Sequence, residues 1–219
     1  MSLLGLSALG GLLGLDGTSV GQFMVSRPLV AGTVTGWLMG EPLLGATIGA
    51  VLELYLLVSF PTGGSRFPEG ATATVVAVGS AATTGGPGSL AVAVAVGLVW
   101  GHVGGFSITG LRRLNASLVP SEDDPTPSAS AVAWLHVGTL ALDFLRGAVV
   151  VAGGLIFGRA LVGALAPIWP LDAPASMGLV LVGAAVSLGI LLRDFGGFRT
   201  NRVRLVIGIA LGLAGARLL

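Results

Sequence analysis

The sequence has no cysteine, no lysine and only two histidines, and these absences exclude several classes of function. Without cysteine there is no disulfide framework, no thiolate nucleophile and no thiolate metal site. His102 and His136 are too few for a histidine-rich metal centre, so neither a metal nor another cofactor is expected. The formal net charge of +1 provides no basic patch for nucleic acid, and no nucleic-acid partner is expected.

Enzymatic motifs are also missing from the sequence. The glycine-rich stretch at 83–89 lacks the lysine of a phosphate-binding loop and is better explained as a turn between helices. No serine lies in a nucleophile elbow. We therefore expect the chain to have no catalytic residues of its own.

Charged residues are scarce and apolar residues abundant. Only 10% of the 219 residues are charged, 53% are hydrophobic, and the mean hydropathy is +0.95. Ordinary soluble domains are about 25% charged. The 37 glycines would weaken a water-soluble helical bundle, but in lipid they let helix backbones approach closely. The composition predicts an all-α, polytopic membrane protein in contact with the lipid bilayer.

Hydropathy divides the chain into two parts of a single membrane domain, 1–219. A bilayer crossing needs about 20 apolar residues, and four segments in the part from 88 to 219 approach or exceed that length: 88–110, 131–157, 175–192 and 203–219. The part from 1 to 87 has shorter apolar pieces at 2–15, 28–40, 43–60 and 71–83. Short pieces suggest one or more broken or re-entrant helical hairpins, which we expect in addition to about five to eight membrane segments.

Two polar connections set the predicted orientation. The loops at 111–130 and 193–202 hold five of the arginines and are separated by two apolar segments, which places both loops on one side of the membrane. The positive-inside rule assigns that side to the cytoplasm. The acidic run at 122–124 does not oppose this, because orientation follows arginine and lysine and does not follow net charge.

A proline interrupts the apolar run at 27–61 and predicts a helical hairpin. Glycines spaced by four, at 32, 36 and 40 and again at 45 and 49, form a stripe on each arm. This spacing alone does not decide between an internal helix contact and a subunit contact. Pro42 ends a helix, and half-helix ends inside a membrane build binding sites in many transporters. Glu53, within the second arm, is either a substrate acceptor or a structural partner of Arg27 or Arg66.

The residues of this region resemble the membrane subunit IIC of the mannose/sorbose class of bacterial sugar phosphotransferase systems. The similarity is carried by the pair Asp16-Gly17, by Gln22, by the "RPLV.G...G...G" run from Arg27, and by the "G..IGA.LEL" run from Gly45. The later segments 135–147 and 166–192 are similar in order and character. At 63–72, where the family commonly has small residues followed by two prolines and an aspartate, this chain has "GGSRFPEGAT".

The resemblance implies a sugar carrier of the bacterial inner membrane. Such a subunit works with a IID membrane subunit and with the soluble phosphocarriers IIA and IIB, in an assembly of several copies. The sugar is bound outside, reoriented and phosphorylated at the cytoplasmic face, and the phosphohistidines lie on the soluble subunits. The altered 63–72 run leaves an alternative open: a non-transporting scaffold subunit that kept the fold without the sugar site. A third reading is an ion- or proton-coupled carrier that uses Asp143.

Sugar recognition needs carboxylates and amides that accept hydroxyl hydrogens. Asp16 and Glu53 are the expected hydroxyl acceptors, Gln22 a bidentate amide, and Arg27 a partner that keeps a carboxylate ionised. The remaining expected substrate-binding residues are Arg66 and Glu69. For Asp16 and Gln22 the alternative is helix capping.

Four other polar side chains of the apolar segments have expected structural roles. Asp143 and Arg146 lie three residues apart on one helix face, and the simpler interpretation is mutual neutralisation rather than a proton relay. The two histidines, His102 and His136, are expected to be buried, neutral and hydrogen-bonded between helices.

Overall fold

The computed structural model describes residues 1–57, 59, 65–119 and 127–217. Within these residues the chain forms eight α-helices, one 3-10 turn and no strand. Their bounds are α1 Leu3–Thr18, α2 Pro28–Met39, α3 Pro42–Leu56, α4 Gly70–Ala81, α5 Pro87–Ser117, α6 Ala129–Leu165, η1 Ala166–Ile168, α7 Ala173–Asp194 and α8 Gly197–Ala216. The all-α class predicted from the sequence is confirmed.

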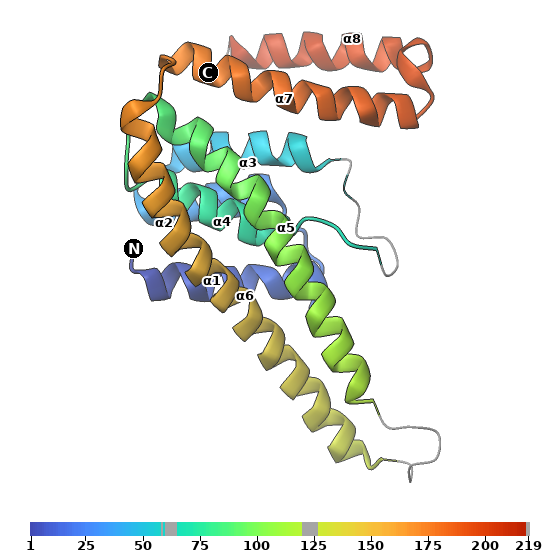
Figure 1. Cartoon of the computed structure of the whole chain (residues 1–219). Coiled ribbons are helices and arrows are strands. Elements are labelled where there is room, and N and C mark those ends of the chain that lie inside the picture. The colour runs from blue at the N-terminus through green and yellow to red at the C-terminus, as the bar shows by residue number, and fades with distance from the viewer. Residues whose placement is uncertain (58, 60–64, 120–126, 218–219) are drawn as a thin grey trace.

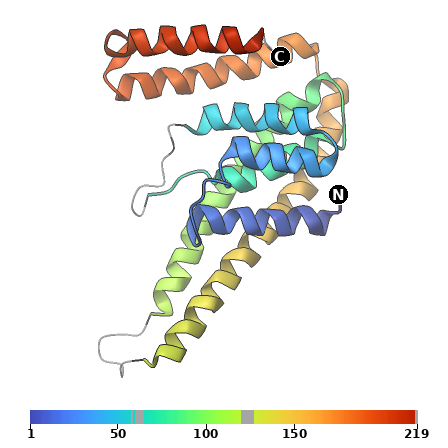
Figure 2. The same cartoon turned by 180° about the vertical axis from the view of Figure 1, so that it is seen from behind.

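Two long helices and a C-terminal hairpin frame the molecule. Figures 1 and 2 show α5 and α6 running beside each other, with α1 to α4 packed along part of their length and the α7–α8 hairpin lying across one end. By length and composition, α5, α7 and the 129–168 segment could each cross a bilayer. The α8 segment does not reach the same hydropathy, because Arg199, Arg202 and Arg204 lie in its first half. Of the span predicted at 203–219, the described part, up to 217, is therefore not among these crossing helices.

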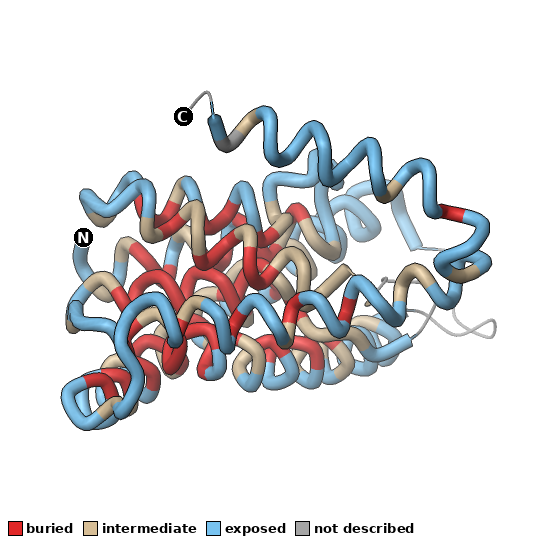
Figure 3. The backbone as a smooth tube through the Cα atoms, turned by 90° about the horizontal axis from the view of Figure 1, so that it is seen from above, coloured by how far each residue is buried: buried red, intermediate tan, exposed pale blue. Residues whose placement is uncertain are grey.

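The centre of the core is α4, a helix of only 12 residues. It contacts α1, α2, α3, α5 and α6, and every residue from Ala71 to Ala81 is buried. Figure 3 shows this buried centre, with exposure increasing toward the α7–α8 hairpin. Small side chains such as Ala73 and Ala77 allow so many helices to meet around one short helix. The apolar surface on α5 to α8 is exposed in the single chain, as is usual where helices face lipid.

The predicted hairpin at 27–61 forms as α2 and α3, and its glycine stripes face each other. A Cβ atom at Gly36 would lie 2.7 Å from the Gly45 Cα atom, and one at Gly32 would lie 2.7 Å from the Gly49 Cα atom. The arms turn at Gly40, whose φ of 82° favours glycine, and at the exposed Glu41. The stripes therefore make an internal helix contact.

The helices extend beyond the boundaries predicted from hydropathy. Helix α5 continues through Arg112 and Arg113 to Ser117, and α6 begins at Ala129, so the predicted 111–130 loop is shorter than expected. The predicted 193–202 loop shrinks to a turn at 195–196. Hydropathy marks where a chain leaves the hydrocarbon, whereas a helix can continue into the headgroup region. The acidic run at 122–124 lies outside the described residues.

Candidate functional site

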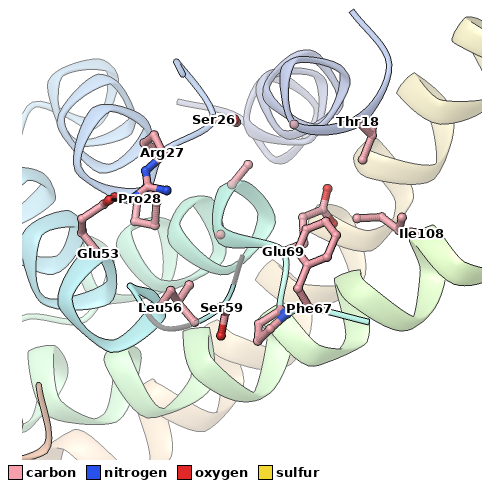
Figure 4. A pocket seen from close by; sticks show the side chains of 14 residues that line it. Thr18, Ser26, Arg27, Pro28, Glu53, Leu56, Ser59, Phe67, Glu69 and Ile108 are labelled. Carbon is pink, nitrogen blue, oxygen red and sulfur yellow. Dashed lines mark hydrogen bonds and ion pairs between the residues drawn. The ribbon is translucent and has the colours of Figure 1, made fainter. Parts of the chain in front are cut away.

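A cavity of about 100 Å³ lies where the end of α1, the start of α2, the end of α3 and the segment before α4 meet. Its polar side chains include Thr18, Arg27, Glu53 and Glu69, and its apolar walls include Leu56, Phe67 and Ile108. Figure 4 shows the Arg27 and Glu53 side chains directed toward each other on one side of the cavity, with Thr18 and Ile108 on the opposite side. Carboxylate, guanidinium and hydroxyl groups beside apolar walls suit a small neutral polyol.

The α2–α3 hairpin positions the first ion pair of this cavity. Arg27 precedes Pro28 at the start of α2, Glu53 lies near the end of the antiparallel α3, and the Arg27 Nη2 atom pairs with Glu53 Oε1. The second carboxylate oxygen accepts a long bond of 3.4 Å from the Leu29 backbone N–H, at the positive end of the α2 dipole. The side chains are 38% and 18% exposed, so this pair remains accessible from the cavity.

Glu69 belongs to a second, almost fully buried ion cluster. Both of its oxygens face the Arg146 guanidinium, at 2.8 Å to Nη2 and 2.9 Å to Nη1. The Arg146 Nε atom also donates to Asp143 Oδ1 at 2.8 Å. The side chains of Arg146, Glu69 and Asp143 are 8%, 6% and 0% exposed. We call these three residues the buried triad.

Hydroxyl groups complete the hydrogen bonding of the buried triad. Thr72 donates to Glu69 Oε2 at 3.0 Å, and Arg146 Nη1 donates to Ser107 Oγ at 2.9 Å. Thr18 and Ser19 both donate to Asp143 Oδ2. The triad thereby connects α1, α5, α6 and the start of α4. The predicted Asp143–Arg146 pair is present, but the sequence interpretation missed Glu69 as its third member.

The other predicted site residues lie outside the cavity. Asp16 is in the last turn of α1, where its oxygens accept the Phe23 and Ser26 backbone N–H groups at 2.6 and 2.9 Å. It therefore organises the loop before α2, and it does so without capping a helix end. Gln22 is exposed in that loop with a φ of 53°, an uncommon conformation for a residue other than glycine.

Arg66 also lies away from the Arg27–Glu53 pair. Its guanidinium carbon is 5.6 Å from the centre of the Phe106 ring, and it lines a separate hollow of about 70 Å³ beside α5. The structure thus brings Arg27, Glu53 and Glu69 to the cavity and leaves Asp16, Gln22 and Arg66 outside it.

The prediction that both histidines are buried between helices is wrong for this chain. His102 and His136 are exposed on α5 and α6. Both histidines have apolar neighbours in the sequence, but on a membrane helix apolar residues also face lipid, so such neighbours do not show that a position is buried. Neither histidine lines the cavity that holds Arg27 and Glu53.

Comparison with known proteins gives a consistent family signal. The family described as "PTS system sorbose-specific IIC component" matches residues 1–194. The mannose-specific EIIC component of Escherichia coli (strain K12) is 24% identical over 135 residues, which cover 61% of this chain and 50% of that protein. The sorbose-specific EIIC component of Klebsiella pneumoniae is 27% identical over 135 residues, which again cover 61% of this chain and 50% of that protein. The chain spans about half the length of the curated relatives it matches.

The fold is also found among solved structures. A structure described as "Structure of membrane protein" superposes with a TM-score of 0.73 at 18% identity, over 99% of this chain and 91% of that one. At this identity the likeness concerns the fold alone, and it extends over nearly every helix described above.

Proposed function

Because the chain belongs to the sorbose-specific IIC family of the phosphotransferase system, we propose that it is the membrane subunit that binds and translocates a hexose-like sugar. The observation that carries this proposal is the cavity with the Arg27–Glu53 pair at its wall. A carboxylate beside an arginine is a strong acceptor for sugar hydroxyls. The chain supplies binding and passage, and phosphoryl transfer belongs to its partners.

The size of the cavity indicates that sugar binding requires movement. Ligand sites usually enclose about 300 to 1,000 Å³, and this cavity holds about 100 Å³. One wall is the segment from Phe67 to Glu69, which is not helical and precedes α4. The buried triad fixes the Glu69 end of that segment to α6, so the Phe67 end is the part that can withdraw to admit a sugar.

Replacing Glu53 with glutamine is expected to reduce sugar uptake roughly 10- to 100-fold, the effect of losing about 1.5 to 3 kcal/mol from one charge-assisted hydrogen bond. Uptake of labelled sugar by cells carrying the variant measures this. Glu41→Gln is the matched control, because Glu41 is exposed at the hairpin turn and the change in charge is the same. Equal uptake by wild type and Glu53→Gln, at equal amounts of membrane-inserted chain, would remove Glu53 from the site.

Family membership also supports proposals for partners and location. We propose that the chain resides in the bacterial inner membrane with the 111–130 and 193–202 regions at the cytoplasmic face. There it assembles in several copies with a IID-like subunit and receives IIA- and IIB-like phosphocarriers. Gentle solubilisation of a tagged chain from its host, followed by mass spectrometry, should recover a IID-like and a IIB-like protein. Recovery of the chain alone, or with an unrelated complex, favours the scaffold reading.

A further inference from the structure

Three basic side chains, from α5 and from the segment before α4, lie around Phe67 and Phe106, next to the proposed sugar cavity. Arg66 and His102 line the hollow of about 70 Å³, together with Phe67 and Phe106. Arg112 does not line this hollow, but its guanidinium carbon lies 5.7 Å from the centre of the Phe67 ring, which does. We call Arg66, His102 and Arg112 the basic cluster. All three residues are exposed.

Aromatic rings hold the two guanidinium groups of the basic cluster in place. Arg66 lies over Phe106 and Arg112 over Phe67, both within the range of a cation–π contact. A guanidinium whose face contacts a ring keeps its N–H edges available for a planar or tetrahedral oxyanion. Arg112 donates to the Ser65 carbonyl oxygen at 3.3 Å. Among the residues that the structure describes, most of the donors in the cluster therefore remain available to a ligand.

The basic cluster differs from the other arginines that surround the cavity. Arg27 pairs with Glu53, and Arg146 pairs with Glu69 and Asp143. Within the described ranges, by contrast, no carboxylate forms an ion pair with Arg66 or Arg112. Arg66 lies in the segment before α4 and Arg112 lies on α5, and Arg112 donates to the carbonyl oxygen of Ser65, the residue before Arg66, so the two cations lie on adjoining segments. An oxyanion would offset their mutual repulsion.

We propose that the basic cluster is a binding site for a phosphate group. Arginine binds phosphate through paired N–H donors, and an imidazole N–H adds a further donor. Two sources of phosphate fit the location. One is an anionic lipid headgroup, because Phe106 and Val103 on the same helix are exposed and suit a lipid-facing surface. The other is a sugar phosphate, because Phe67 and Pro68 line both this hollow and the sugar cavity.

The phosphate site itself does not depend on the proposed transport function; only the sugar-phosphate source does. Purified full-length chain in phosphatidylcholine nanodiscs is titrated with mannose 6-phosphate, with free mannose as the matched probe. In detergent, phosphatidylglycerol is compared with phosphatidylcholine by native mass spectrometry. The Arg66→Gln/Arg112→Gln variant should weaken binding of one phosphate probe at least tenfold. The Arg199→Gln/Arg202→Gln variant, with the same loss of charge on the exposed start of α8, should stay within twofold of wild type.

The mannose 6-phosphate titration and the lipid comparison distinguish the two possible sources of the phosphate group. Loss of mannose 6-phosphate binding with unchanged lipid binding assigns the site to a sugar phosphate, and the reverse assigns it to a lipid headgroup. A His102→Gln variant provides a second, milder test on an exposed residue that forms no ion pair within the part of the chain that the structure describes. If neither probe binds wild type more tightly than it binds the Arg66→Gln/Arg112→Gln variant, the proposal is wrong. Failure of the sugar uptake test alone would leave the lipid assignment intact.

Discussion

Replacing Arg146 with methionine is expected to lower the free energy of unfolding by about 3 to 5 kcal/mol, the largest effect of any single change discussed. The methionine fills a similar volume but leaves Glu69 and Asp143 buried without their shared cation. Isolated carboxylates in a low-dielectric interior are strongly unfavourable. The expected result is a large fall in the melting temperature of the detergent-solubilised chain, measured by intrinsic fluorescence of its four tryptophans.

Two further variants separate charge from packing in this test. A triple variant, Glu69→Gln, Asp143→Asn and Arg146→Met, removes the whole network and should recover most of the lost stability, because no unpaired charge remains. Arg193→Met breaks only the exposed pair with Asp194, so it should change stability by about 1 kcal/mol at most. Arg146→Met with a wild-type melting temperature would contradict the role given to the buried triad.

Replacing Gly36 with alanine is expected to destabilise the chain by about 1 to 3 kcal/mol through overpacking of the α2–α3 hairpin. The new Cβ would lie 2.6 Å from the Glu41 carbonyl oxygen and 2.7 Å from the Gly45 Cα atom. Both neighbours are backbone atoms, so the helices themselves must separate. Since the hairpin carries Arg27 and Glu53, we expect sugar uptake to fall together with the melting temperature.

The matched control for this substitution is Gly138→Ala. Gly138 lies within α6, and an added Cβ there meets no atom within 4 Å. Alanine is favoured over glycine in a helix by about 1 kcal/mol, so this variant should be neutral or slightly more stable. Equal melting temperatures for Gly36→Ala and Gly138→Ala would show that the glycine stripe does not set the spacing of the hairpin.

Much of the fold could be predicted from the sequence because its signals are local. The proline at 42 and the four-residue glycine spacing predict the α2–α3 hairpin, and the long apolar segments predict α5, α6 and α7. The resemblance to the IIC family, drawn from residues 15–64, is confirmed by the family match over 1–194. Local hydropathy did not predict where helices end, since α5 continues through Arg112 and Arg113. It also did not distinguish lipid-facing from buried positions, as His102 and His136 show.

The site could be predicted only in part because it depends on long-range contacts. Glu53 was expected to contact either substrate or one of two arginines, and the structure gives Arg27 as its ion-pair partner. Glu69 and Arg146 are separated by 77 positions, and nothing local to either residue indicates their contact. The sequence signal for this contact is the need to pair buried charges. Arg146 lies in the middle of an apolar segment and needs an anion, and a buried Glu69 needs a cation.

We propose above all that this chain moves sugar through the cavity beside Arg27 and Glu53. It is tested most directly by sugar uptake and sugar-phosphate accumulation in a host strain that lacks the chain, complemented with wild type, Glu53→Gln or Glu41→Gln. We expect wild type and Glu41→Gln to restore uptake of labelled mannose or sorbose, and Glu53→Gln to restore at most about a tenth of it. Equal uptake with and without the chain would contradict a transport role and leave the scaffold reading in its place.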